Sequence, residues 1–283
     1  MIIDTHSHLN FEAFKKDSDE VIKRTLGQNI WLINVGTRYE TSEEAVKIAE
    51  KYKEGVYAAI GLHPIYAGTE FVKIKTDQSE GEFLTKEQGF DKEKYKELAK
   101  SKKAVAIGEI GLDYYYRPKT NAKLHQFKDS QKKVFIEQLE LAEELNLPVI
   151  VHCRMAHADI LDILKSKTEK LRGVIHCFTG TEAEMEEYLK LGFYIGLNGI
   201  IFKLNMDEAI KQCPPDRILV ETDCPYLTPL PAEVSAKAGP KGYVRNEPVF
   251  IKYIIQKISN LKGISFEKIA KITTQNAQQL FKI

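Results

Sequence analysis

Cysteine and tryptophan are scarce in this 283-residue sequence, which has four of the first and one of the second. The cysteines are Cys153, Cys177, Cys213 and Cys224, and no two of them have CxxC spacing. A small secreted domain held by disulfides needs a denser set, so we expect reduced thiols. Long hydrophobic runs are also missing, and no stretch approaches the roughly 18 apolar residues of a membrane-spanning helix. The amino terminus, MIIDTHSHL, lacks the basic and apolar regions of a signal peptide, and we therefore expect a cytoplasmic protein without a membrane anchor.

An excess of one charge is absent as well. The 41 basic residues nearly match the 40 acidic residues, and the formal net charge is +1. This balance argues against a broad basic surface that holds nucleic acid through its phosphates alone. A nucleic-acid ligand would have to be held locally, by bound metal ions and a few basic side chains. Apolar residues make up 43% of the chain, which is enough for a sizeable core.

Eight short apolar runs, rich in β-branched residues, alternate with longer stretches of helical periodicity. The runs are Met1–Thr5, Trp31–Gly36, Val56–Leu62, Ala104–Ile110, Pro148–Cys153, Gly173–Cys177, Phe193–Leu197 and Arg217–Thr222. Such alternation is typical of repeated βα units, and strands that are apolar throughout indicate burial on both faces. We predict an α/β fold with a parallel sheet, either a closed barrel or a doubly wound sheet. The clearest helix is predicted over Phe127–Leu145, and the last over Ser265–Phe281.

Two long segments interrupt the alternation. Gly68–Gly89 is polar and punctuated by glycine, and we interpret it as an insertion in the loop after the third strand. Pro229–Asn246 contains several prolines and glycines and forms a second long loop after the eighth strand. Neither has the composition of a linker between independent domains, and barrels of roughly 250 residues are common as single domains. We therefore predict one domain, residues 1–283.

Histidine and carboxylate residues gather where five of the eight runs end. They are His6, His8, Glu109, His152, His176 and Asp223. Because the βα loops of a barrel converge at the carboxyl ends of its strands, these side chains would share one pocket. Side chains two residues apart on a strand face the same way, so His6 and His8 could bind one ion. Six ligands exceed what a single tetrahedral ion uses, which favours two divalent ions bridged by Glu109.

Each of these residues taken alone has a simpler interpretation. A single histidine at a strand end is more often a hydrogen-bonded structural residue, and a single carboxylate can pair with a base or cap a turn. The joint pattern favours metal binding. His63, at the end of the third run, could line the pocket or hold the turn before Pro64. Strand alternation would point Cys153, Cys177 and Cys224 away from the site, unless a strand ends before its cysteine.

Few basic or aromatic residues near the motifs could contact a substrate. Arg154 and Arg245 could each hold a phosphate with two hydrogen bonds, although an ion pair with Glu247 explains Arg245 at least as well. The run Tyr114–Tyr116 could stack on the base of a single strand. Core and loop packing explains at least two of these three tyrosines better.

Seven motifs follow one another from Asp4 towards the carboxyl-terminal helix. They are DTHSHL, GLHP, GEIGLDYY, VIVHCR, HCFTG, ETDCPYLTP and RNEP. This set resembles the TatD family of metal-dependent deoxyribonucleases in order and spacing. The resemblance implies a TIM-type (β/α)8 barrel that carries two divalent ions, magnesium or manganese in use, with zinc, nickel or cobalt as alternatives. It assigns one ion to His6, His8, Glu109 and Asp223. The second ion is assigned to Glu109, His152 and His176.

The resemblance also implies hydrolysis of DNA phosphodiester bonds, often from 3′ to 5′ and with a preference for single strands. The substrate would be DNA, and we infer no obligate protein partner. In that reaction Asp223 would take the proton of the attacking water, Glu109 would fix the spacing of the ions, and Arg154 would neutralise charge on the phosphate. His63 and Arg245 are further candidates for substrate contacts. Two departures from the family pattern are the Gly68–Gly89 insertion and the absence of an acidic residue shortly after Arg154. The alternatives are a hydrolase of another ester or amide bond, such as an aminoacyl-tRNA deacylase, and a binding protein that has lost catalysis.

Overall fold

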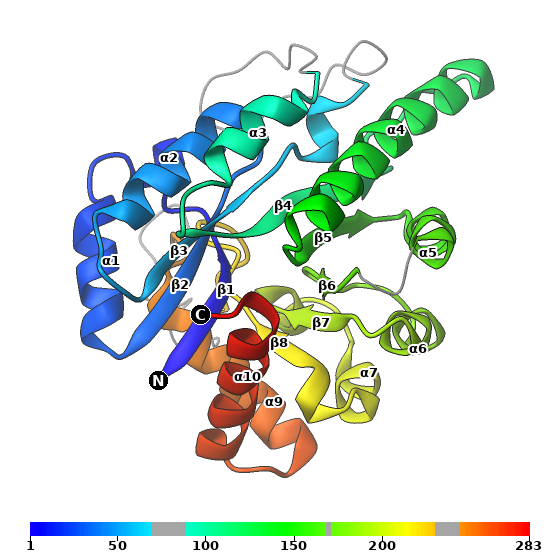
Figure 1. The fold of residues 1–283 in the computed structure, drawn as a ribbon. Coiled ribbons are helices and arrows are strands. Elements are labelled where there is room, and N and C mark those ends of the chain that lie inside the picture. The colour runs from blue at the N-terminus through cyan, green and yellow to red at the C-terminus, as the bar shows by residue number, and fades with distance from the viewer. Residues whose placement is uncertain (69–88, 168–170, 230–243) are drawn as a thin grey trace.

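Eight parallel strands form one sheet, and their order around the sheet is their order along the chain (Figure 1). The computed structural model describes residues 1–68, 89–167, 171–229 and 244–283. The strands are β1 (Ile2–Ser7), β2 (Ile30–Val35), β3 (Val56–Ile60), β4 (Ala104–Asp113), β5 (Val149–Arg154), β6 (Gly173–Ile175), β7 (Tyr194–Leu197) and β8 (Ile218–Val220). Each strand pairs in parallel with the next one. This arrangement confirms the predicted (β/α)8 barrel.

The barrel closes between β8 and β1 through side chains as well as backbone. Ser7 and Cys224 form an isolated parallel bridge. Thr222 donates two hydrogen bonds to the carboxylate of Asp4, from its backbone nitrogen at 2.8 Å and from Oγ1 at 2.5 Å. Burial raises the pKa of Asp4 to about 8. The first residue of the DTHSH motif therefore ties the two edge strands together, which fixes His6 beside the end of β8.

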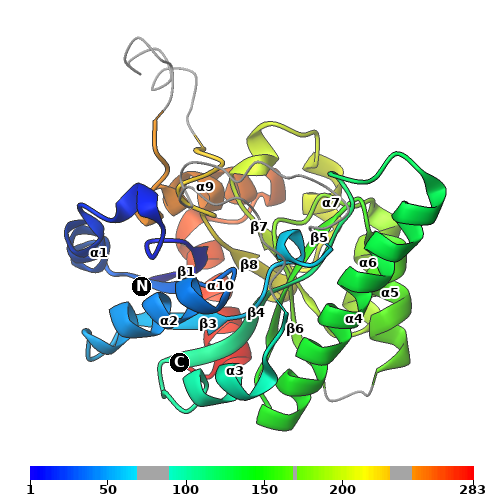
Figure 2. The ribbon, with the colours of Figure 1, turned by 90° about the horizontal axis from the view of Figure 1, so that it is seen from above.

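Helices surround the strands on the outside of the barrel (Figure 1). They are α1 (Ser18–Gly27), α2 (Tyr39–Glu50), α3 (Lys92–Leu98), α4 (Asn121–Leu145), α5 (His157–Ser166), α6 (Glu182–Lys190), α7 (Asp207–Gln212), α9 (Ile251–Lys262) and α10 (Phe266–Phe281). Figure 2 shows α4, α5 and α6 along one side of the barrel. Within the described ranges, no helix is both long and apolar enough to cross a membrane.

Apolar side chains form two separate clusters, one on each side of the strands. The larger cluster joins residues such as Leu32 and Val151 to the buried faces of the surrounding helices. The smaller cluster takes residues from all eight strands together with Leu280 and Phe281 of α10. Because the larger cluster packs against the surrounding helices, the smaller one lies on the other face of the strands, inside the barrel, and the end of α10 is part of it. Apolar packing therefore fills part of the interior and leaves the carboxyl ends of the strands for polar residues.

Several boundaries differ from those expected from the sequence. Strand β4 continues to Asp113, whereas β6 and β8 end at Ile175 and Val220, before their histidine and acidic residues. Helix α4 begins at Asn121, six residues before the predicted start at Phe127. The apolar pattern did not predict these first turns because they are mostly exposed and lack an apolar stripe. The short helix α7 was not predicted. The insertion predicted at Gly68–Gly89 falls, apart from its two terminal glycines, outside the described residues, as does most of the loop Pro229–Asn246.

Gly111 of β4 lies directly against the backbone of His152 in β5. Its φ is +143°, and a Cβ at this position would lie 2.0 Å from the carbonyl oxygen of His152. We expect Gly111→Ala to lower the free energy of unfolding by about 3–4 kcal/mol, measured by chemical denaturation, because backbone must move in a packed barrel. Gly192→Ala is the matched control, since Gly192 also has a positive φ of +82° but no atom within 4 Å of such a Cβ. It should lose only about 1–2 kcal/mol, and equal losses would contradict the role of the close approach.

Candidate active site

The six predicted ligands come together at the carboxyl ends of the strands. His6 lies in β1 and His8 one residue beyond it, Glu109 in β4 and His152 in β5. The remaining two, His176 and Asp223, follow β6 and β8. Five of the six line one cavity of about 700 Å³, and His6 is fully buried beneath it. The parallel barrel thus produces the convergence that the motif positions predict.

His6, His8 and Asp223 form the first group of possible metal ligands. The Nε2 atoms of His6 and His8 face each other at 3.1 Å, and the Nε2 atom of His8 lies 3.4 Å from Asp223 Oδ1. His8 Nδ1 lies 2.8 Å from the carbonyl oxygen of Val35, which can only accept, so this nitrogen carries the proton. In neutral His8 the lone pair is therefore on Nε2 and points into the group. Converging lone pairs of this kind suit a cation.

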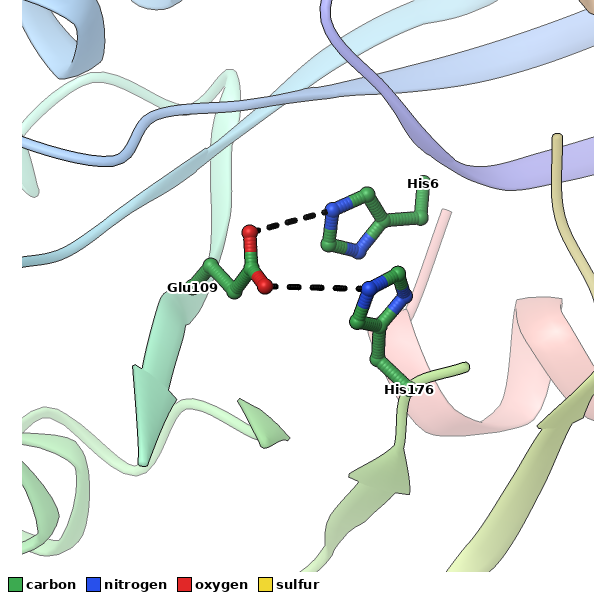
Figure 3. A group of neighbouring side chains, drawn as sticks. All are labelled: His6, Glu109 and His176. Atoms are coloured by element: carbon green, nitrogen blue, oxygen red, sulfur yellow. Dashed lines mark ion pairs between the residues drawn. The ribbon is translucent and has the colours of Figure 1, made fainter. Parts of the chain in front are cut away.

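Glu109 lies between this first group and a second one. Its Oε2 is 3.4 Å from His6 Nε2, whereas its Oε1 is 2.7 Å from His152 Nδ1 and 3.7 Å from His176 Nε2. Figure 3 shows the carboxylate with one oxygen towards His6 and the other towards His176. Each oxygen of one carboxylate faces a different set of imidazoles. This is the placement that a ligand shared by two ions requires.

Two further carboxylates, which the sequence analysis did not assign, hold the histidines of the second group. Asp113 Oδ2 lies 3.2 Å from Nε2 of His152, and Glu221 Oε1 lies 2.8 Å from Nδ1 of His176. In both cases the contact uses the ring nitrogen that faces away from Glu109. Carboxylates in this position fix the orientation of a metal-binding imidazole and make it more basic. A signal was present, because Asp113 follows Glu109 in GEIGLD and Glu221 opens ETD.

His63 serves both of the purposes that the sequence left open. Its Nδ1 accepts a hydrogen bond of 3.0 Å from the backbone of Ile65 and so holds the turn at Pro64. The proton of the neutral ring is therefore on Nε2, which lies 3.4 Å from Glu109 Oε1 in the same cavity. A nitrogen that carries a proton donates a hydrogen bond and does not bind a metal. His63 is placed as a donor to Glu109 or to a bound substrate.

The charges of the cluster fix its protonation. Burial opposes charge on Glu109, but His63, His152 and His6 hold its pKa well below its usual range. Burial and the neighbouring His176 lower the pKa of His6 to about 4, so this ring is neutral. Despite burial, Asp113 and Glu109 raise the pKa of His152 to about 9. A divalent ion beside Glu109 would displace that proton, so metal binding is coupled to proton release.

The position of Cys177 differs from the one that strand alternation predicted. Cys177 lines the cavity, with Sγ 3.6 Å from Asn198 Oδ1, instead of pointing away from it. Strand β6 ends before this residue, and φ of Cys177 is +46°, so alternation no longer applies. Cys153 also borders the cavity, and its Sγ lies 3.2 Å from His157 Nδ1. Cys224 is fully buried, as expected.

The two arginine candidates lie in different surroundings. Arg154 lines the cavity, and its guanidinium carbon lies 3.6 Å from the centre of the Tyr115 ring. Arg245 is not among the residues that line this cavity, and it pairs with Asp17 at 2.5 Å and with Glu247 at 3.2 Å. These contacts favour the ion-pair interpretation of Arg245, and its contact with substrate stays a prediction.

The exposure of the tyrosines that follow β4 differs from the expectation that packing explains at least two of them. Tyr114 is buried, and its hydroxyl donates a hydrogen bond of 2.8 Å to Asp159. Tyr115 and Tyr116 are 50% and 45% exposed, so packing accounts for one of the three tyrosines and not for two. Strand β4 ends at Asp113, and the next residues lie at the mouth of the cavity.

Glu221→Gln is expected to weaken metal binding about 10- to 100-fold, because His176 loses its charged partner while the side chain keeps its size. Competition with a chelating dye measures this affinity. Glu187→Gln, on α6 and paired only with surface lysines, is the control and should bind metal as the unchanged protein does. Equal affinities in the two variants would show that Glu221 does not support a metal-binding histidine.

The sequence matches proteins of one family over nearly its whole length. The family described as "TatD related DNase" matches residues 3–282. The chain is 39% identical to the "Uncharacterized metal-dependent hydrolase YabD" of Bacillus subtilis, and the alignment covers 100% of both chains. It is 33% identical to the "3'-5' ssDNA/RNA exonuclease TatD" of Escherichia fergusonii, over 100% of this chain and 99% of that one.

Solved structures show the same likeness. The TatD homologue YjjV of Escherichia coli superposes with a TM-score of 0.77 at 27% identity, over 100% of this chain and 98% of that one. A TatD family hydrolase of Entamoeba histolytica gives a TM-score of 0.78 at 26% identity, over 99% and 97% of the two chains. A phosphotriesterase homology protein of Escherichia coli, with a TM-score of 0.60, is 14% identical over 99% and 98% and shares the fold alone.

Proposed function

The chain belongs to the TatD family of metal-dependent hydrolases, and from this premise we propose that it cleaves DNA phosphodiester bonds with two divalent ions. The observation that carries the proposal is the position of Glu109, whose two carboxylate oxygens face two separate sets of histidines. We further propose that it removes nucleotides from the 3′ end of single strands. The name of the relative from Escherichia fergusonii supports this direction and this strand preference.

The side chains of the cluster fit a pair of divalent ions. His6, His8, Asp223 and one oxygen of Glu109 would hold one ion. The other oxygen of Glu109, with His152 and His176, would hold the second. Imidazole and carboxylate donors suit manganese, zinc, nickel or cobalt, and a magnesium site would rely more on water. Bound as a pair, such ions stabilise the attacking and leaving oxygens of a phosphodiester and lower the pKa of a water.

The chain's own residues would supply the proton transfers and the phosphate contacts. Asp223 lies at the cavity, and although burial opposes its charge, His8, His176 and His6 hold its pKa below the usual value. It is therefore ionised at neutral pH and able to accept the proton of the attacking water. His63 would donate its Nε2 proton to a phosphate oxygen. The exposed guanidinium of Arg154 would balance charge on the same phosphate.

Three finer points accompany this proposal. We assign residues 1–283 to one hydrolase domain, because all eight strands belong to one sheet. We place the activity in the cytoplasm and expect no obligate protein partner. RNA is a possible second substrate because the name of the relative from Escherichia fergusonii includes it.

The proposal is tested with 3′-labelled and 5′-labelled single-stranded DNA of one sequence, the matching duplex and the matching RNA. Each substrate is incubated with Mg²⁺, with Mn²⁺ and with EDTA. We expect the 5′-labelled strand to shorten one nucleotide at a time and the 3′ label to be released first, with no reaction in EDTA. Absence of cleavage by protein that binds two ions would contradict the nuclease and would favour a hydrolase of another ester, such as an aminoacyl ester.

A further inference from the structure

Exposed apolar side chains are concentrated around the mouth of the active-site cavity. Among the residues that the structure describes, six large apolar or aromatic side chains are exposed. They are Met1, Tyr115, Tyr116, Met155, Phe202 and Leu204. Four of the six, Tyr115, Tyr116, Met155 and Leu204, line this cavity. We call these four side chains the apolar rim. Large apolar groups that gather at one cavity indicate a binding site.

The rim comes from three separate βα loops. Tyr115 and Tyr116 follow β4, Met155 follows β5, and Leu204 lies after β7, just beyond the 3-10 helix η3 (Gly199–Phe202). None of these side chains is needed to fill the interior, because the apolar clusters of the barrel do not include them. Exposure of their apolar surface to water is unfavourable in free energy. A ligand that covers them recovers this free energy.

Met155 has a backbone conformation that supports a role at the mouth. Its φ is +57°, in the left-handed region that non-glycine residues seldom adopt, and 61% of the residue is exposed. The unbranched thioether adapts to flat apolar ligands of different shape. Residues held in such sparsely populated backbone conformations cluster at active sites and ligand-binding sites. Met155 therefore belongs to the binding surface and not to the fold.

The two tyrosines present aromatic rings beside a positive charge. Their rings meet edge to face at 4.8 Å between centroids. The guanidinium of Arg154 lies over the Tyr115 ring, and Arg154 directly follows Cys153 and the ligand residue His152. The cavity therefore has a polar floor of histidines and carboxylates, a guanidinium above it, and an apolar rim. A nucleotide has the matching parts, since its phosphate suits the floor and the guanidinium while its base suits the rim.

We propose that the apolar rim is a nucleobase-binding platform, on which an unpaired base next to the scissile phosphate stacks on the face of one tyrosine ring and contacts the other ring and Met155 at its edges. This inference rests on the proposed phosphodiesterase activity and names the part of the substrate that the site recognises. Stacking contacts the face of a base and leaves its hydrogen-bonding edges free. The platform therefore accepts all four bases. A base in a duplex must leave its pair and its stacked neighbour before it can reach the rim, and this costs free energy that an unpaired end does not spend. The platform therefore selects unpaired ends, which gives the strand preference a physical origin.

The test compares two single-stranded oligonucleotides that differ only at the 3′ end. One has natural nucleotides there, and in the other the last two nucleotides are abasic. With Mn²⁺-loaded protein we expect the KM for the abasic end to be about 5- to 150-fold higher, the range that the loss of one stacked base produces. The double variant Tyr115→Ala, Tyr116→Ala should raise the KM for the natural end, so that the ratio of the two KM values falls towards one. Tyr253→Ala, on α9 and outside the cavity, is the matched control and should keep the ratio.

The possible outcomes distinguish a failure of the proposed platform from a failure of the proposed cleavage activity. Equal KM values for both ends in the unchanged protein, or a double variant that keeps their ratio, would overturn the platform. If no oligonucleotide is cleaved, fluorescence anisotropy of the same two oligonucleotides with the metal-loaded protein replaces KM by Kd. A preference for the natural end that the double variant loses would then support the platform while the proposed activity fails. The absence of that preference in binding would overturn both.

Discussion

Replacing Glu109 with alanine is expected to abolish cleavage and to leave the protein with fewer than two divalent ions per chain. Among the described residues, Glu109 is the one carboxylate whose two oxygens face both groups of imidazoles, at 3.4 Å from His6 and 2.7 Å from His152. Its loss removes a ligand from each ion and leaves the positive charge of the pair less compensated. Because two ions supply several kcal/mol of transition-state stabilisation, kcat should fall at least about a thousandfold.

The control for this variant is Glu186→Ala, at an exposed position on α6 that takes no part in the cavity. Metal content after dialysis against Mn²⁺, measured by mass spectrometry, accompanies the kinetics. A Glu109→Ala protein that retains two ions and most of its activity would show that the ions are not bridged by this residue. Circular dichroism of both variants checks that they remain folded.

Replacing Asp223 with asparagine is expected to lower kcat about 10²- to 10⁴-fold, the usual contribution of a general base. Asparagine has the same size and retains one oxygen as a possible ligand, but it cannot accept a proton. The pKa of Asp223 lies below its usual value because His8, His176 and His6 outweigh the effect of burial. The base form is thus present at neutral pH, and activity due to Asp223 is lost only as the pH falls through that lowered pKa.

The measurement is kcat against pH for the unchanged protein and for Asp223→Asn, at saturating Mn²⁺ and with the metal content determined in parallel. Asp216→Asn is the control, since Asp216 is exposed and lies before the amino end of β8, whereas the cavity lies at the carboxyl end of that strand. A variant that holds two ions and keeps nearly full kcat would remove Asp223 from the proton transfer. A variant that holds one ion would assign the loss to binding.

The residues of the candidate metal site were predictable because their convergence depends on local sequence and on one global rule. Each lies at the end of an apolar run, and parallel strands in a barrel bring their carboxyl ends together. His6, Glu109 and His152 therefore converge from separate parts of the chain without any information about loops. The prediction required only the alternation of strands and helices and the chemistry of the side chains.

Other features depend on contacts that no periodicity reports. Cys177 faces the cavity because β6 ends two residues earlier than the apolar run suggested. Asp113 and Glu221 support histidines through contacts between different strands, and Arg245 is held by Asp17 from a distant helix end. Exposure of Tyr115 follows from the end of β4 and from the path of the loop after it. Strand ends and loop paths are set by tertiary packing, which overrides local preference.

The central claim is a pair of divalent ions that share Glu109, and electron paramagnetic resonance of the Mn²⁺-loaded protein tests it most directly. Mn²⁺ is added to metal-free protein in steps while the bound ions are counted. The account predicts two ions per chain and, at the second equivalent, the spectrum of a spin-coupled pair that Glu109→Ala does not give. Saturation at one ion, or two ions with the spectra of isolated Mn²⁺, would contradict the shared carboxylate and the mechanism built on it.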